Sequence, residues 1–411
     1  MHDVSVMENN AMRALRCSLE RDGPVHWSSQ ESLMIADAQT AQRFDAENFS
    51  DLMMLDGFSE VVLGKKSQAI SWAQLRSVWA TQMRQLTNSG GIRELTLRMN
   101  NILKAESGRQ QDLAWLGERI AIESLIPCII SGLAPAAHRR IVSEVLSKVT
   151  WVLSDVEQDF NLRWHRMKML YFQILAGLEV RRELKRRAGG QKPRQQDLAD
   201  AVIELLPQLG IDRAVDAVTA LLTAITGSPG AAAACLLYEL DRQHYWRERL
   251  ETEFSNVSFE KLYESPMRAA PLAGRFVKEI LRIWSSPPIV SRRARTDISH
   301  GAVTLKVGQH YYLSSYMIHR NTTDWSNPEI FDPDRWLADG QHEACRHSSY
   351  VPFGWAPKSC IGANLGMSQL IVLVYLLCTR YRLQVSNPER AKIAVASVVR
   401  PIEFHGSVQL R

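Results

Sequence analysis

The chain has 411 residues, of which 45% are hydrophobic and 23% are charged, so it has enough apolar side chains for a large core. Its formal net charge of +5 is mild, and no basic stripe with interleaved aromatic residues is present, which argues against a nucleic-acid binder. The six cysteines are scattered without the spacing of a disulfide framework, as is typical of a reducing compartment.

Residues 1–10 lack the basic start and the apolar core of a signal peptide. Apolar residues then recur at helical spacing in five segments: 71–107, 112–164, 197–206, 214–240 and 259–285. Strand character appears mainly after Pro288, in four segments: 303–306, 310–314, 381–385 and from 402 onward. Helices first and a small sheet last, with no internal repeat or linker, predict a mainly α fold with a small β region. We predict a single domain over residues 1–411.

The segment 217–238 carries no charge and is long enough to cross a bilayer. Its middle reads Ile225-Thr-Gly-Ser-Pro-Gly230, which is a poor centre for a lipid-facing helix. Between a membrane span and a buried central helix, we therefore predict the buried helix. Pro229 inside such a helix removes one backbone hydrogen bond and predicts a kink with free carbonyl groups.

Cys360 lies in the stretch Val351-Pro-Phe-Gly-Trp-Ala-Pro-Lys-Ser-Cys-Ile-Gly362, before an apolar run that predicts a helix over 370–378. A thiol at the start of a helix is near backbone N–H groups and the positive end of the helix dipole, which lower its pKa. The resulting thiolate is a good axial ligand for haem iron. Gly362 allows the backbone to approach a flat macrocycle. The alternative is a buried structural cysteine, which is what most single cysteines are.

The segment from Phe353 to Gly362 closely resembles the haem-binding loop of the cytochrome P450 family. That loop usually reads Phe-Gly-x-Gly-x-Arg/His-x-Cys-x-Gly. Here Ala356 stands at the second glycine and Lys358 at the usual arginine. Lys358 keeps a positive charge for a haem propionate but lacks the planar fork of arginine. Neither departure removes the cysteine ligand.

Further segments resemble marks of the same family, in the expected order. They are Trp72-Ala-Gln-Leu-Arg76, Glu279-Ile-Leu-Arg282, Pro287-Pro288 with Arg292-Arg293-Ala294, His319-Arg320-Asn321 and Phe331-Asp-Pro-Asp-Arg335-Trp336. By itself, Glu279 with Arg282 is an ordinary ion pair at i,i+3 on a helix. Five marks in order make coincidence a poor explanation, and the resemblance covers nearly the whole chain.

The resemblance implies a cytochrome P450 fold, a helical prism that encloses non-covalently bound haem b. It implies that Cys360 is the iron ligand, that Glu279, Arg282 and Arg335 form a buried ionic cluster, and that several other residues contact the haem. Those other cofactor contacts are Trp72, Arg76, Arg293, Phe353, Gly354, Lys358 and Gly362, with Arg293 preferred to Arg292 by spacing. It also implies a soluble, cytoplasmic, monomeric protein of the bacterial type, without a membrane anchor.

The resemblance further implies monooxygenation of a small-molecule substrate, with dioxygen and with electrons from ferredoxin and ferredoxin reductase. A basic face near Lys358 suits an acidic electron carrier. Small residues on the central helix, such as Ala224, Gly227 and Gly230, indicate space for a bulky specialised metabolite.

The expected oxygen-activation motif on the central helix is atypical. The family usually carries Ala/Gly-Gly-x-Asp/Glu-Thr, but alignment places Gly227 at the acid and Ser228 at the threonine, or Ser228 and Pro229 after a one-residue slip. The carboxylate is absent in both registers. We take Ser228 and Thr226 as catalytic candidates for a proton relay with water. The alternatives are peroxide-driven turnover, or another reaction such as rearrangement, coupling or nitration.

Rival functions have weaker support. His342, Cys345 and His347, with Cys360, have the side chains of a zinc site, although structural zinc usually has tighter paired spacing. A haem protein that senses or stores a ligand without turnover is a second alternative. A serine hydrolase is disfavoured because no Gly-x-Ser-x-Gly elbow occurs.

Overall fold

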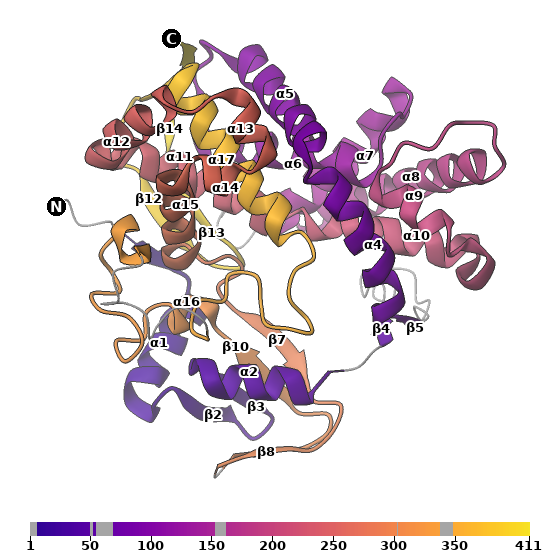
Figure 1. The fold of residues 1–411 in the computed structure, drawn as a ribbon. Coiled ribbons are helices and arrows are strands. Elements are labelled where there is room, and N and C mark those ends of the chain that lie inside the picture. The colour runs from indigo at the N-terminus through magenta and orange to yellow at the C-terminus, as the bar shows by residue number, and fades with distance from the viewer. Residues whose placement is uncertain (1–5, 50–51, 55–68, 153–161, 302, 338–347) are drawn as a thin grey trace.

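In the computed structural model, the described residues are 6–49, 52–54, 69–152, 162–301, 303–337 and 348–411 (Figure 1). The helices are α1 (Asn10–Asp22), α2 (Ala38–Glu47), α4 (Trp72–Leu86), α5 (Ser89–Glu106), α6 (Leu113–Ile129), α7 (Pro135–Val152), α8 (Leu162–Ala188), α9 (Leu198–Ile203), α10 (Leu206–Ala224), α11 (Ser228–Arg242), α12 (His244–Ser255), α13 (Phe259–Glu264), α14 (Pro266–Ala269), α15 (Pro271–Ile283), α16 (Ser315–Ile318), the 3₁₀ helix η2 (Pro333–Trp336) and α17 (Ala363–Thr379). The predicted mainly α fold with a small β region is confirmed.

The described strands form five small sheets. The strands are β1 (Val6–Glu8), β2 (Val25–Ser29), β3 (Ser32–Ile35), β4 (Leu52–Met54), β5 (Ala69–Ser71), β6 (Gln111–Asp112), β7 (Val290–Arg293), β8 (Ile298–His300), β9 (Val303–Leu305), β10 (His310–Leu313), β11 (Tyr381–Val385), β12 (Lys392–Val395), β13 (Val399–Ile402) and β14 (His405–Leu410). The largest sheet has the order β2-β3-β10-β7 and joins the N-terminal part of the chain to the segment after α15.

Helices and the largest sheet occupy different parts of the molecule. In Figure 1 most helices fill the upper and right-hand parts, and β2, β3, β10 and β7 lie below them beside α2. In this sheet β10 runs parallel to β3 and antiparallel to β7. A buried cluster that includes Leu33, Phe44 and Tyr311 packs α2 onto the sheet, separately from the larger helical core.

The long apolar segment is two helices, not the one continuous helix predicted over 214–240. Helix α10 ends at Ala224, and α11 begins at Ser228 after Gly227, whose φ and ψ are −122° and −84°. Pro229 therefore lies in the first turn of α11, where its missing N–H leaves no helical bond unmade. The predicted proline kink inside a helix is replaced by a break just before the proline.

The region Leu206–Arg242 is long and apolar enough to span a membrane, and 61% of its most apolar window is buried inside the protein. Within α11, every residue from Gly230 to Leu240 is buried. Helix α6 packs closely along α11. At Gly117 the two backbones are so near that an added Cβ would lie 2.9 Å from Ala234 Cα. The buried-helix prediction is therefore confirmed for α11.

Helix α17 carries the chain away from Cys360 into the core. It is apolar on nearly all sides, and most of its residues from Leu365 to Cys378 are buried. It packs against α5, α11, α12 and α15. A helix held from several sides fixes the position of the loop that precedes it.

Candidate haem-binding site

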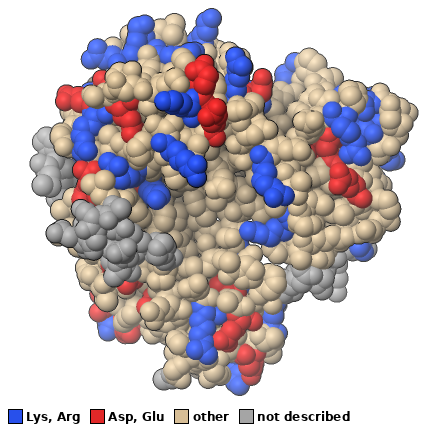
Figure 2. All heavy atoms as spheres, viewed as in Figure 1, with Lys and Arg blue, Asp and Glu red and all other residues tan. Residues whose placement is uncertain are grey.

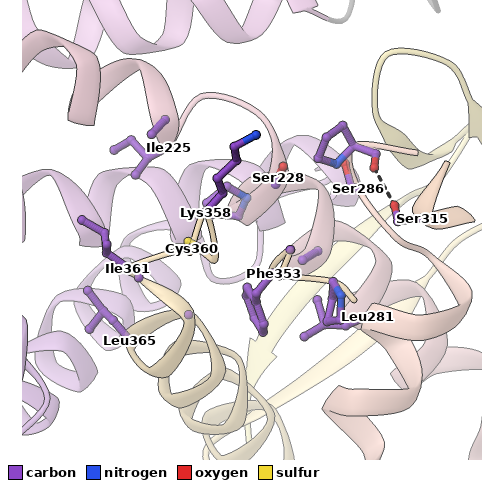
Figure 3. A pocket seen from close by; sticks show the side chains of 18 of the residues that line it. Ile225, Ser228, Leu281, Ser286, Ser315, Phe353, Lys358, Cys360, Ile361 and Leu365 are labelled. Atoms are coloured by element: carbon purple, nitrogen blue, oxygen red, sulfur yellow. Dashed lines mark hydrogen bonds between the residues drawn. The ribbon is translucent and has the colours of Figure 1, made fainter. Parts of the chain in front are cut away.

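A cavity of about 410 Å³ lies between the Cys360 loop and the start of α11. Its wall includes Cys360 and Phe353 from the loop, Ser228 from α11, Leu365 from α17 and Ser286 from the segment after α15 (Figure 3). Most of the remaining lining is aliphatic. The predicted ligand and one predicted catalytic residue therefore share one mainly apolar cavity.

The Cys360 loop is held by a tight backbone turn. Gly354 has a φ of 70°, in the left-handed region that glycine adopts without steric cost, and its N–H donates to Val351 O at 3.3 Å. The backbone N–H of Cys360 then donates to Phe353 O at 2.7 Å. The Phe-Gly pair thus folds the loop back on itself and places Cys360 just before the first turn of α17.

The surroundings of the Cys360 thiol contain groups that raise its pKa and groups that lower it. The backbone N–H of Gly362 and the positive charge of Arg76 lower the pKa of this thiol, as predicted for the start of a helix. Cys360 is exposed at the cavity, but the surrounding protein atoms still desolvate its thiol, and this larger effect raises the pKa above the usual value. For the thiol without a bound metal ion, the prediction of a lowered pKa is therefore wrong. A bound metal ion would displace the thiol proton outright.

A buried ionic cluster lies behind the loop. Glu279 and Arg282, both fully buried on α15, pair at 2.8 Å, and Arg335 from η2 donates to Glu279 Oε1 at 3.0 Å. Trp336 Nε1 donates to the other oxygen, Oε2, at 3.1 Å. Arg282 also donates to the backbone oxygens of His319 and Pro328. The cluster expected from the resemblance is thus assembled, and it ties α15 to the irregular segment before the loop.

His319 joins this cluster to the cysteine loop, a role that the sequence did not show. Its Nδ1 lies 3.0 Å from Arg282 O, and its Nε2 lies 2.8 Å from Val351 N. The Val351 N–H must donate, so Nε2 is unprotonated and Nδ1 carries the hydrogen. Burial first, and then the charge of Arg282, lower the pKa of His319 to about 3. The imidazole is therefore neutral and links two segments that are remote in sequence.

The cation from β7 that lines the cavity is Arg292, not the predicted Arg293. Arg292 reaches the cavity wall and its Nε lies 3.3 Å from Asp45 Oδ1. Arg293 is exposed, and its Nε donates to Gly308 O at 3.1 Å. Successive side chains on a strand point to opposite faces, so an error of one residue in spacing selects the wrong face.

Lys358 also lines the cavity, where its Nζ lies 3.1 Å from Asp45 Oδ1. Burial lowers the pKa of Lys358, and the charge of Asp45 partly opposes this effect. Asp45, which is 5% exposed, is therefore shared by two cations of the cavity wall. The sequence contained no signal for this carboxylate.

The predicted haem contacts Trp72 and Arg76 lie on α4, and Arg76 contacts the Cys360 loop. Arg76 donates to Ser359 O at 2.7 Å and to Ser359 Oγ at 3.1 Å, so it holds the residue next to Cys360. Its guanidinium lies 5.6 Å from the centre of the Trp72 ring. The Trp72 Nε1 atom is buried and has no hydrogen-bond partner among the described residues.

The two predicted catalytic residues are placed differently. Ser228 lines the cavity together with Cys360, whereas Thr226 is buried and its Oγ1 donates to Thr223 O at 2.8 Å. Ser286, which was not predicted, lines the cavity with a buried Oγ that has no partner among the described residues. Asp45 is the only carboxylate residue among the described residues that line the cavity.

The predicted zinc ligands His342, Cys345 and His347 lie outside the described residues. Within the part of the chain that the structure describes, no group of three or more His, Cys, Asp or Glu side chains is placed to hold a metal ion.

Comparison with known proteins identifies the family. The family model for cytochrome P450 matches residues 140–403, which is more than half of the chain. The chain belongs to the cytochrome P450 family. Members of this family bind protoporphyrin IX haem through a cysteine thiolate.

Curated P450 relatives match only in part. A cytochrome P450 4A12B of Mus musculus is 37% identical over 131 residues, which are 31% of this chain and 25% of the relative. A steroid 17-alpha-hydroxylase/17,20 lyase of Squalus acanthias is 28% identical over 190 residues, which are 45% of this chain and 37% of the relative. These matches span well under two thirds of the relatives' own length.

Solved P450 structures match over nearly the whole chain. A zebra fish cytochrome P450 with progesterone has a TM-score of 0.77 at 16% identity, covering 98% of this chain and 100% of its own. A cyanobacterial P450 with retinoic acid bound has a TM-score of 0.78 at 15% identity, covering 96% of this chain and 94% of its own. At such low identity the likeness shows the P450 fold and nothing finer.

The residues of this P450 fit a haem group. Cys360 supplies a thiol at the cavity wall, and Gly362 leaves space beside it, since an added Cβ would lie 3.7 Å from the Cys360 Sγ. Arg292 and Lys358 at the cavity are donors suited to the two carboxylates of haem, and the Nε1 of Trp72, beside Arg76 on α4, is a further donor without a partner among the described residues. The donor set therefore matches the cofactor that the family uses.

Proposed function

We propose that this P450 is a haem-thiolate monooxygenase that oxidises a bulky, mainly apolar organic metabolite. The observation that supports it most is one cavity with Cys360 on one wall and Ser228, at the first turn of α11, on another (Figure 3). Aliphatic side chains make up most of the lining between them. Haem would take the part of this cavity beside Cys360, and an aliphatic lining with few polar groups around the rest is the usual form of a site for a hydrophobic small molecule.

The bound haem would supply dioxygen activation, and Cys360 would supply its axial ligand. The side chains of Arg292, Lys358, Arg76 and Trp72 would hold the haem carboxylates. The Glu279 cluster and His319 keep the cysteine loop in place without contact with the reacting atoms. Ser286 Oγ, buried without a partner among the described residues, is available to hydrogen-bond a polar group of the substrate.

Proton delivery would use Ser228 and water in place of the usual acid. Ser228 begins α11, so its hydroxyl lies at the helix end where backbone N–H groups are not used by the helix. Those N–H groups and the positive end of the helix dipole favour negative charge in the cavity. Ser228 Oγ would hold the proton that moves to the reacting oxygen. Thr226, with its hydroxyl bonded to Thr223 O, has a weaker case.

We further propose a ferredoxin-type electron donor and a cytoplasmic, monomeric protein. In Figure 2, lysine and arginine side chains border a hollowed, mostly uncharged centre of the face that is viewed. Positive charges around such a depression suit an acidic redox protein. The cysteines among the described residues are unpaired, which supports a reducing compartment.

A second candidate is peroxide-driven turnover. It is favoured by the cavity lining, where the only carboxylate among the described residues, Asp45, is paired with Lys358 and Arg292, and Ser228 is the polar side chain at the start of α11. Peroxide already contains the oxygen–oxygen bond and its protons, so it has less need of a proton donor. Rearrangement, coupling and nitration belong to the same group of alternatives.

Two measurements test the proposal. The carbon-monoxide complex of the reduced protein should absorb at the long wavelength of thiolate-ligated haem, and Cys360→Ala should abolish that band. Turnover should then be compared between NADPH with ferredoxin and its reductase, and peroxide alone. A peroxide rate equal to or above the reductase-driven rate selects the second candidate, and a colourless protein or imidazole ligation rejects both.

A further inference from the structure

Asp45 occupies an unexpected place among the cations of the cavity. One of its oxygens, Oδ1, lies 3.1 Å from Lys358 Nζ and 3.3 Å from Arg292 Nε. These two cations come from the cysteine loop and from β7, whereas Asp45 comes from α2. A single buried carboxylate therefore bridges two side chains that the proposed function assigns to the haem carboxylates.

The position of Asp45 is fixed by its surroundings. The hydroxyl of Tyr311 on β10 donates to Asp45 Oδ1 at 3.4 Å, and Asn48 Nδ2 donates to that hydroxyl at 3.0 Å. Tyr311 is fully buried, so this support does not exchange with water. Asp45 also lines the cavity itself. Its carboxylate is thus held at the cavity wall rather than directed into solvent.

The charges at this wall have a simple consequence. Lys358 and Arg292 carry two positive charges, and Asp45 already neutralises one of them. A haem carboxylate near the same two cations would meet the negative charge of Asp45, which already binds Lys358 Nζ and Arg292 Nε. Two carboxylates that share cations in a partly buried site would repel each other appreciably. Asp45 should therefore weaken the hold of the two cations on the cofactor.

We propose that Asp45 is a positioning residue that competes with a haem propionate for Lys358 and Arg292, and so lowers the affinity of the chain for haem. The inference rests on the proposed function, because it assumes that the cavity binds a dicarboxylate porphyrin. It predicts that removal of the Asp45 charge tightens haem binding, which is the opposite of the result for an ordinary structural residue.

The test measures haem loss from the full-length protein to excess apomyoglobin. Asp45→Asn is compared with the unaltered protein, each loaded either with haem or with haem dimethyl ester, in which both carboxylates are neutral. Haem loss from Asp45→Asn should be about two- to fivefold slower, the range for one partly screened ion pair. Loss of the dimethyl ester should proceed at equal rates from both proteins.

A matched control is Glu47→Gln, on the same helix. Glu47 is exposed, pairs with Arg43 at 2.8 Å, and carries the same charge two residues from Asp45. Its substitution should leave the loss of both porphyrins unchanged. A slower haem loss in this variant would show that net charge, and not the bridge to Lys358 and Arg292, controls affinity.

The outcomes separate the inference from the function. Equal or faster haem loss from Asp45→Asn overturns the inference, and so does an equal effect on the dimethyl ester. If Asp45→Asn folds poorly, Asp45→Ser removes the same charge with a smaller side chain. If both variants lose the ability to bind the dimethyl ester, Asp45 has a structural role, and this result also overturns the inference. Failure of the unaltered protein to bind haem at all would instead reject the proposed function.

Discussion

His319 Nε2 accepts a hydrogen bond from the backbone N–H of Val351 at 2.8 Å, at the point where the chain enters the cysteine loop. The other ring nitrogen binds the backbone of Arg282, which is part of the buried ionic cluster. One neutral imidazole therefore transmits the position of α15 to the loop that carries Cys360. This link gives a prediction that depends on pH.

Stability should fall in acid because of His319. Its pKa is lowered from 6.5 to about 3 in the folded protein, so unfolding takes up a proton at any pH between these values. The stability present above pH 6.5 is therefore lost progressively as the pH falls toward 3, by up to about 1.4 kcal/mol per pH unit. Urea unfolding at pH 7.5 and 5.5 should show a larger loss for the unaltered protein than for His319→Gln. Equal losses would contradict the assignment.

Glu279→Gln should destabilise the fold severely. The substitution removes the carboxylate that Arg282 and Arg335 share and leaves two buried guanidinium groups without a counter-charge. Breaking a buried pair in this way costs about 3–5 kcal/mol. The free energy of unfolding from denaturant titration is the measurement. Glu329→Gln, which removes an exposed partner of Arg320, is the control and should change little.

Substitutions of the neighbouring arginines Arg292 and Arg293 on β7 should differ in their effect on the rate of haem loss. Arg292→Gln removes a cation at the cavity wall, so we expect about tenfold faster haem loss, as for a lost charge-assisted contact. Arg293→Gln alters an exposed side chain bonded to Gly308 O and should leave haem loss unchanged. Transfer of haem to apomyoglobin measures both. A larger effect at Arg293 would restore the assignment made from spacing.

Ser228→Ala should uncouple turnover without preventing haem binding. The hydroxyl lines the cavity at the start of α11, and loss of a positioned proton donor costs on the order of 10²-fold in rate. The measurement is product formed per NADPH consumed, with peroxide release followed in parallel. Thr226→Ala is the comparison, because that hydroxyl is bonded to Thr223 O. Unchanged coupling in Ser228→Ala would remove Ser228 from the mechanism.

The cysteine loop could be predicted because its geometry is local. The Phe-Gly turn needs a left-handed glycine, and its hydrogen bond joins Phe353 to Cys360 within a few residues. The choice between Arg292 and Arg293 could not be made in the same way, since it depends on which face of β7 meets the cavity. Asp45 escaped prediction because α2 reaches the site only through the packing of the sheet.

The hydrophobic pattern of the central segment predicted its burial but not the break between its two helices. An uncharged, alanine-rich segment predicts burial, and α11 is buried. The same pattern does not show whether the helix is continuous. The break is set by Gly227 and Pro229 and by the different main packing partners of the two halves. Ser228 thus lies at a helix start and not inside a helix, which changes the backbone groups available beside it.

The break between Ala224 and Ser228 also changes the main packing partners of the chain. Helix α10 packs mainly with α8 and α9 and less with α6 and α7, whereas α11 packs mainly with α6 and also with α15 and α17. Helix α6 therefore contacts both halves of the segment, and its contact with α11 is much the more extensive. Ser228 therefore keeps its place at the cavity wall with Cys360 through the packing of α11, whatever direction α10 takes before the break.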